Sequence, residues 1–302
     1  MSVVSFSSSS GSGQNPSAKV TVSSLQDKKS KHEPITVLTA YDYATARLVD
    51  EAGVDIVLVG DSLAMVVLGY ENTLSVTMDE MLHHTRAAHR GVKRALLVAD
   101  MPYGSYQLGE KEAVANAARF LKEGGAEAVK LEGGEKRVDL IRRMQDAEIP
   151  VMGHIGLTPQ SIHRMGGYKV QGKTLDAAER LMRDAIALDR AGVFSIVLEG
   201  IPREIAAMIR AEVSAPTIGI GAGRDCDGQV LVLHDILGLS FAPPAKFVRR
   251  YAEVGTAIAD AVRRFKEDVQ NEAYPLEEES YHLPADTQAA LDNLLVRKAM
   301  RR

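Results

Sequence analysis

Short apolar runs alternate with longer amphipathic stretches along most of the chain, starting at residue 35. Several runs are apolar throughout instead of alternating with polar residues, which is typical of parallel strands covered on both faces. The pattern predicts seven strands, at 35–40, 56–59, 95–99, 128–131, 151–153, 195–198 and 217–220, and a weaker eighth at 230–233. Helical patterns lie between them, at 45–52, 78–89, 110–123, 136–146, 175–190 and 203–212.

This repeated unit of strand and helix predicts a (β/α)8 barrel, the TIM-barrel fold of the α/β class. The segment from 35 to 270 is close in length to the ~250 residues typical of such a barrel. A helix from 246 to about 269 is expected to close the domain. Because the eighth strand is weak, an open doubly wound sheet is the second possibility.

The two ends of the chain have a different composition. Residues 1–34 contain eleven serines and too few apolar side chains to offset the entropy of ordering, so we expect a disordered arm. Residues 271–302 combine an acidic cluster at 277–279 with a basic end, and we expect a peripheral tail with a helix at 289–300.

Overall composition narrows the class of protein. Hydrophobic residues make up 45% of the chain, and the net charge of −4 argues against a nucleic-acid or anionic-membrane binder. No apolar run reaches the roughly 20 residues that span a bilayer, and no signal peptide precedes the first strand. The single cysteine, Cys226, excludes an intrachain disulfide and a four-thiolate metal site. We therefore expect a soluble, cytoplasmic protein.

Polar side chains stand where the apolar strands end, which is where barrel enzymes carry their catalytic groups. They are Asp61, Ser62, Asp100, Lys130, Glu132, His154 and Glu199. Any one of them could simply cap the following helix. As a set they indicate an active site, because so many buried ionisable groups need partners or a metal.

The three acids Asp61, Asp100 and Glu132 offer only hard oxygen ligands, which favours Mg²⁺ over zinc. Lys130 lies on the same face of its strand as Glu132. It is either a salt-bridge partner of a neighbouring acid or a counter-ion for a substrate carboxylate.

Two roles are possible for each of Glu199 and His154. Glu199 suits a base that removes a proton from carbon next to a carbonyl, or it is a fourth metal ligand. His154 is either a buried core histidine or a hydrogen-bond donor to a substrate oxygen.

Several long motifs are similar to the ketopantoate hydroxymethyltransferase family, from about residue 35 to 281. They are TAYDY (39–43), LVGDSLAMVVLGYENTLSVT (58–77), DMPYGSY (100–106), VKLEGGE (129–135), GHIGLTPQS (153–161), GGYKVQG (166–172), IGIGAG (218–223), DGQVLVLHDILG (227–238) and KFVRRY (246–251). The resemblance implies a barrel of the phosphoenolpyruvate/pyruvate type, a Mg²⁺ site and a homodecamer. The implied reaction transfers a hydroxymethyl group from 5,10-methylenetetrahydrofolate to 3-methyl-2-oxobutanoate, in pantothenate biosynthesis.

Carried over motif by motif, the resemblance also implies residue roles. Asp61, Asp100 and Glu132 correspond to the metal-site acids. Ser62 and Lys130, together with the two aspartates, correspond to the contacts of the 2-oxo acid. Glu199 corresponds to the proton acceptor.

Three other functions stay open at this point. A carbon–carbon lyase or mutase of the same barrel type commonly uses a catalytic cysteine, for which the surroundings of Cys226 are unsuitable. A non-catalytic protein could bind 2-oxo acids with Mg²⁺. In a nucleotide-binding oxidoreductase, Gly219–Gly223 would form a dinucleotide-binding loop, but the GxGxG spacing disfavours this function.

Overall fold

The computed structural model describes residues 18–300 and contains eight parallel strands that close into a barrel in sequence order. They are β1 (Ile35–Thr39), β2 (Ile56–Val59), β3 (Leu96–Asp100), β4 (Ala128–Glu132), β5 (Val151–Gly156), β6 (Ser195–Glu199), β7 (Thr217–Ile220) and β8 (Gly228–Leu231). β8 begins at Gly228, earlier than predicted, and pairs with β7 and β1 to close the ring. The predicted (β/α)8 barrel is confirmed, and the open sheet is excluded.

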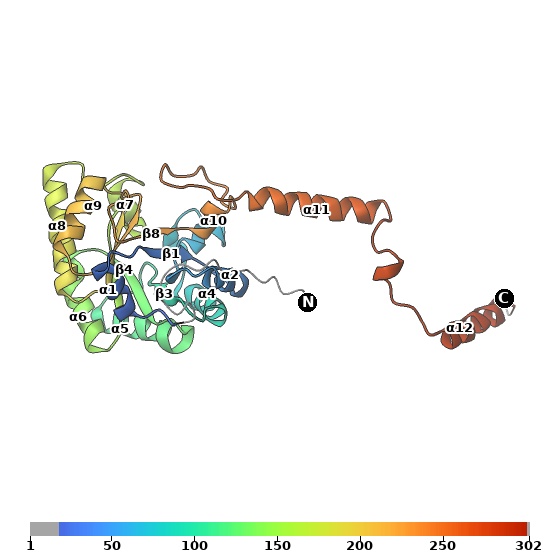
Figure 1. Cartoon of the computed structure of the whole chain (residues 1–302). Helices are drawn as coiled ribbons and strands as arrows, with labels where there is room; N and C mark the ends of the chain where they lie inside the picture. Colours follow the sequence, from blue (N-terminus) through green and yellow to red (C-terminus); the bar gives the residue numbers. More distant parts are fainter. Residues whose placement is uncertain (1–17, 301–302) are drawn as a thin grey trace. The chain divides into compact units, whose positions relative to one another are not determined.

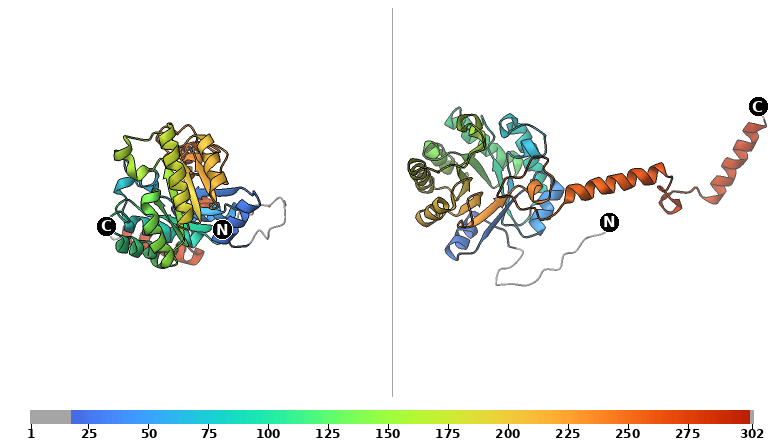
Figure 2. Two further views of the ribbon diagram at one scale, coloured as in Figure 1. Left: turned by 90° about the vertical axis from the view of Figure 1, so that its left-hand side faces the viewer. Right: turned by 90° about the horizontal axis from the view of Figure 1, so that it is seen from above.

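The longer helices lie outside the ring of strands (Figures 1 and 2), and three four-residue helices lie in the loops that follow β2, β5 and β8. They are α2 (Tyr43–Glu51), α3 (Leu63–Val66), α4 (Met78–Gly91), α5 (Glu110–Arg119), α6 (Val138–Asp146), α7 (Ile162–Met165), α8 (Leu175–Arg190), α9 (Arg203–Glu212) and α10 (Leu233–Ile236). Local sequence sets their starts: Thr77 and Glu80 form a capping box at α4, and the Thr174 side chain caps α8.

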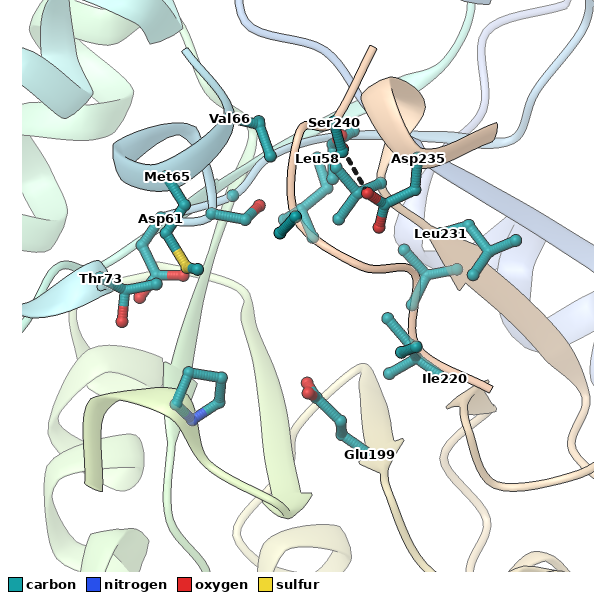
Figure 3. A pocket seen from close by; sticks show the side chains of 18 of the residues that line it. Leu58, Asp61, Met65, Val66, Thr73, Glu199, Ile220, Leu231, Asp235 and Ser240 are labelled. Carbon is teal, nitrogen blue, oxygen red and sulfur yellow. Dashed lines mark hydrogen bonds between the residues drawn. The ribbon is translucent and has the colours of Figure 1, made fainter. Parts of the chain in front are cut away.

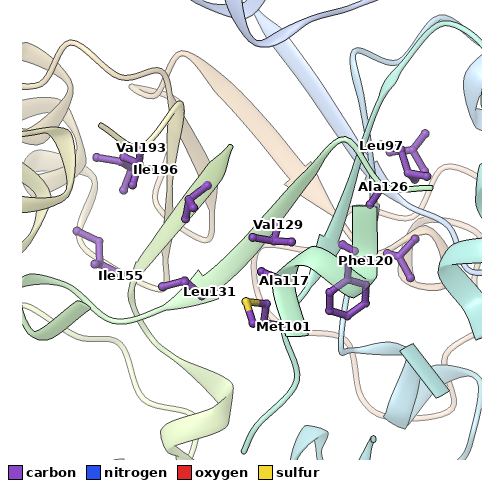
Figure 4. Close-up of a cluster of buried hydrophobic side chains, with 14 of the residues drawn as sticks. Leu97, Met101, Ala117, Phe120, Ala126, Val129, Leu131, Ile155, Val193 and Ile196 are labelled. Atoms are coloured by element: carbon purple, nitrogen blue, oxygen red, sulfur yellow. The ribbon is translucent and has the colours of Figure 1, made fainter. Parts of the chain in front are cut away.

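The pleat of each strand divides the apolar side chains into two cores. In β2, Ile56 and Leu58 join the cluster inside the barrel, whereas Val57 and Val59 join the cluster beneath the helices. Figure 4 shows part of the outer cluster, in which Phe120 lies near Val129 of β4. Because of the same alternation, the polar side chains at the ends of several strands point into the mouth of the barrel.

The predicted disordered arm is wrong for residues 18–34, which contain helix α1 (Val22–Ser30). Leu25 of α1 is fully buried and belongs to the cluster inside the barrel. Lys28 Nζ lies 2.7 Å from Asp55 Oδ1, just before β2, and Lys29 Nζ lies 3.2 Å from Asp227 Oδ2, just before β8. Helix α1 therefore closes the N-terminal end of the barrel. Residues 1–17 lie outside the described part of the chain.

The barrel also ends earlier than residue 270. The chain divides into two compact units at residues 252 and 253. The second unit carries α11 (Val254–Gln270), which the sequence assigned to the barrel, and α12 (Ala285–Ala299). No side chain of α11 is buried, so this helix does not complete the barrel core. Within residues 18–300, no helix combines the length and apolarity needed to cross a membrane.

Leu25→Ala is expected to destabilise the protein by about 2–5 kcal/mol, the usual cost of a large cavity in a packed core. Urea unfolding followed by circular dichroism measures the change in the free energy of unfolding. Leu108→Ala is the matched control, because Leu108 is 77% exposed. A similar small effect for both variants would show that α1 is not part of the folded core.

Candidate active site

The polar residues predicted from the strand ends meet at one cavity of about 680 Å³ in the mouth of the barrel. All seven line it: Asp61, Ser62, Asp100, Lys130, Glu132, His154 and Glu199. Strand register explains the convergence, because Asp100 lies directly across from Lys130, and Glu132 directly across from His154. Figure 3 shows Asp61 on the left side of the cavity, Glu199 at the lower side and Asp235 on the right.

Asp61, Asp100 and Lys130 form the most tightly connected part of this cavity. The Lys130 ammonium lies 2.6 Å from Asp100 Oδ1, and both side chains are buried. The backbone N–H of Asp61 donates to Asp100 Oδ2 at 3.1 Å. These contacts place the two aspartates in one cavity, as the metal-site prediction requires.

Helix capping does not explain the residues that follow β2. Ser62 stands at the N-cap of α3 but makes no capping hydrogen bond with its side chain. Its Oγ instead lies 2.9 Å from the buried Tyr41 hydroxyl. Ser62 is thus held beside the cavity, with its hydroxyl free of a capping role.

Glu132 is oriented by two residues to which the sequence analysis gave no role. The backbone N–H of Gln160 donates to Glu132 Oε2 at 3.1 Å, and its side-chain amide donates to Asp61 Oδ2 at 2.9 Å. The Tyr106 hydroxyl donates to Gln160 Oε1 at 2.6 Å. Gln160 therefore separates and positions two of the predicted metal-site acids. Both residues lie in the motifs at 153–161 and 100–106, which was the available signal.

His154 links Lys130 to Glu199. Its Nδ1 lies 3.3 Å from Lys130 Nζ, and its Nε2 lies 3.2 Å from Glu199 Oε2. Burial and the nearby Lys130 lower the pKa of His154, which favours a neutral imidazole. Because an ammonium can only donate, Nδ1 accepts and the proton sits on Nε2, facing Glu199. The tautomer follows from these contacts.

The buried acids repel one another strongly. Burial, and then the charge of Asp100, raise the pKa of Asp61 to about 7. Burial and the charge of Asp61 also raise the pKa of Glu132 well above its ordinary value. Burial opposes the charged form of Lys130, yet Asp100 and Asp61 outweigh it and raise the pKa of this lysine. One ammonium thus faces more carboxylate charge than it can balance.

A divalent cation would correct this imbalance, and the donors have the right chemistry for Mg²⁺. Among residues 18–300, no three His, Cys, Asp or Glu side chains converge as a ready-made metal cage. Mg²⁺ does not require one, since it commonly keeps waters and uses one or two carboxylates with substrate oxygens. The residues therefore fit a Mg²⁺ site that the substrate completes.

Two alternative sites have no support in the geometry. Cys226 lies just before β8 and does not line the cavity, and burial raises the pKa of its thiol to about 11. The glycine run at 219–223 leads from β7 through 224–227 directly into β8, without a helix. A dinucleotide loop needs that helix to receive the phosphates.

Comparison with known proteins gives a consistent result. The sequence profile described as ketopantoate hydroxymethyltransferase matches residues 19–277. A "3-methyl-2-oxobutanoate hydroxymethyltransferase" of Koribacter versatilis is 70% identical over 94% of this chain and 97% of that protein. One of Pelobacter propionicus is 59% identical over 87% of this chain and 98% of its own length.

Solved structures share the fold at low sequence identity. A phosphonopyruvate hydrolase, in complex with oxalate and Mg²⁺, superposes with a TM-score of 0.55 at 15% identity, covering 93% of this chain and 96% of that one. A 2,3-dimethylmalate lyase of the PEP mutase/isocitrate lyase superfamily gives 0.54 at 18% identity, covering 93% and 98%. These likenesses agree with the predicted (β/α)8 barrel fold.

In the metal-free protein, Asp61→Asn is expected to make the free energy of unfolding depend less on pH than it does in wild type. The pKa of Asp61 is about 7 when folded, against an ordinary 3.8. Between these values the folded state holds a proton that the unfolded state has lost, so wild-type stability falls as pH rises from about 4 to about 7.

Urea unfolding in a chelator at about pH 5 and about pH 7 measures this loss. The exposed Asp146 provides the control variant, Asp146→Asn. Parallel pH profiles for wild type and Asp61→Asn would contradict a strongly raised pKa at Asp61.

Proposed function

The chain belongs to the ketopantoate hydroxymethyltransferase family, and we infer that it transfers a hydroxymethyl group to 3-methyl-2-oxobutanoate. The donor is 5,10-methylenetetrahydrofolate, water supplies the hydroxyl, and the product is 2-dehydropantoate (ketopantoate), a step in pantothenate and coenzyme A biosynthesis. The observation that carries this proposal is the pairing of one base, Glu199, with an acid cluster and a single ammonium at one cavity.

Lys130 is the binding group for the substrate carboxylate. It is buried and carries a positive charge, which its acidic neighbours stabilise. Ser62 contributes a hydroxyl to the same cavity. Asp61 and Asp100 also line it, beside Lys130 and Ser62. Together they hold the keto acid in one orientation, which lowers the entropic cost of the reaction.

Asp61, Asp100 and Glu132 are the residues that would hold Mg²⁺. The bound ion would act as a Lewis acid toward the 2-oxo group. Support comes from the crowded carboxylates, whose mutual repulsion a cation relieves. Gln160 keeps Asp61 and Glu132 in place by donating to both.

Glu199 removes the C3 proton of the keto acid. Its side chain is only partly exposed and lines the cavity at the end of β6. Loss of the proton leaves an enolate carbon, which forms a bond to the methylene carbon of the folate. That carbon leaves both folate nitrogens, tetrahydrofolate is released with the proton, and water supplies the product hydroxyl. His154 is a positioning residue, because its Nε2 lies 3.2 Å from Glu199 Oε2 and orients that carboxylate toward the cavity.

Assembly into a homodecamer, and a cytoplasmic location, stay predictions. Helix α11 supports self-association, because its apolar side chains form one exposed stripe at helical spacing. The stripe consists of Ile258, Val262, Phe265 and Val269. An exposed stripe of this kind is typical of a surface that another chain covers.

Glu199→Gln is expected to slow deuterium exchange at C3 of 3-methyl-2-oxobutanoate by roughly 10²-fold or more, because amides do not act as bases. Proton NMR in deuterated buffer with Mg²⁺, without folate, measures this step. Calorimetry on the same variant is expected to show retained Mg²⁺ binding. Exchange at the wild-type rate would show that the base lies elsewhere, and loss of Mg²⁺ binding would make Glu199 a ligand.

Asp100→Ala is expected to weaken Mg²⁺ binding and product formation together, since it removes an oxygen donor and the partner of Lys130. Isothermal titration calorimetry with Mg²⁺ and saturating keto acid provides the measurement. Asp146→Ala is the control for loss of an exposed acid. An unchanged Mg²⁺ affinity would refute the ligand role of Asp100.

A further inference from the structure

The acid cluster fills only part of the active-site cavity. At about 680 Å³ the cavity is in the range that holds drug-sized ligands, whereas the keto acid is a small molecule. The remaining lining is largely apolar and includes Leu231 and the segment 239–245, hereafter the 239–245 loop. Phe241 of this loop is fully exposed and lines the cavity, which is typical of a surface that receives a ligand.

One carboxylate stands apart from the metal-site acids. Asp235, in the short helix α10, lines the same cavity on the wall that faces Asp61 (Figure 3). Its Oδ1 accepts a hydrogen bond from Ser240 Oγ of the 239–245 loop. Within residues 18–300, no Lys, Arg or His forms an ion pair with Asp235, and no hydrogen bond occupies its Oδ2.

The charges divide the cavity between two ligands. An anionic keto acid is attracted to Lys130 and repelled by an uncompensated carboxylate, so Asp235 does not serve that substrate. Asp235 instead requires a ligand that presents hydrogen-bond donors, and the apolar walls beside it require a flat, largely apolar body. A reduced pterin meets both needs, because its N3–H and 2-amino group form a pair of adjacent donors that fits a carboxylate.

We propose that Asp235 and the 239–245 loop form the subsite for the pterin ring of the folate co-substrate, with Asp235 accepting from N3–H and the 2-amino group. This inference rests on the proposed function, and it assigns the one-carbon donor to the wall opposite the metal-site acids. The methylene carbon then approaches the keto acid from the side of β8 and α10, while Lys130 and Ser62 hold the acid and Glu199 faces its C3 proton.

The test compares Asp235→Asn with wild type. The amide keeps an oxygen for Ser240 but loses the charge and one acceptor, so we expect KM for 5,10-methylenetetrahydrofolate to rise about 10- to 100-fold, as for a hydrogen bond to a charged group. Deuterium exchange at C3, which is measured without folate, is the internal reference. Relative to wild type, the fold increase in folate KM is expected to be at least about ten times the fold decrease in the rate of C3 deuterium exchange.

Two further measurements separate recognition from a structural effect. Ser240→Ala removes the Asp235–Ser240 hydrogen bond without removing charge, and we expect a smaller change in folate KM. Tetrahydropterin, which lacks the p-aminobenzoylglutamate tail, is expected to compete with the folate in wild type and to lose potency in Asp235→Asn.

The inference is overturned if Asp235→Asn changes folate KM by less than about twofold, or raises the keto-acid KM equally. Equal inhibition of both proteins by tetrahydropterin overturns it as well. A wild-type protein that exchanges no C3 proton and forms no product would refute the proposed function instead, so the two failures are distinguishable.

Discussion

Several buried carboxyl groups crowd around a single lysine at the mouth of this barrel, and the proposed chemistry depends on this crowding. Asp61, Asp100 and Glu132 lie in a cavity where burial raises the pKa of Asp61 to about 7 and that of Glu132 well above its ordinary value. Lys130 compensates only part of the carboxylate charge, because its ammonium is paired with Asp100. Such an arrangement destabilises the empty site and therefore favours the binding of a cation.

The barrel provides the rigid frame that tolerates this charge. Alternation along each strand turns apolar side chains both inward and outward, and at the mouth several strands end in the ionisable groups of the cavity. Helix α1 closes the opposite end with Leu25 and two lysine ion pairs. The apolar packing below the cavity stabilises the fold, while the C-terminal ends of the strands carry the candidate catalytic groups.

The sequence predicted the parts of the structure that depend on periodic patterns. Strands buried on both faces and long amphipathic helices such as α8 have clear signals, and the residues that end the strands therefore identified the site. Gln160 and Tyr106 were missed because they are neutral and reach the acids through contacts that only the fold creates. Helix α1 was missed because a single buried leucine in a Ser- and Lys-rich segment produces no hydrophobic periodicity. Helix α11 was wrongly assigned to the barrel because an amphipathic pattern does not identify the surface against which the helix packs.

The central claim is that Asp61 and Asp100 share one divalent cation. Crystals soaked with Mn²⁺ and the keto acid, measured at the manganese absorption edge, test it most directly, because Mn²⁺ takes the same hard oxygen ligands as Mg²⁺. The account predicts one anomalous peak in the cavity, in contact with both carboxylates. The absence of a peak at saturating Mn²⁺, or a peak away from Asp61 and Asp100, would contradict it.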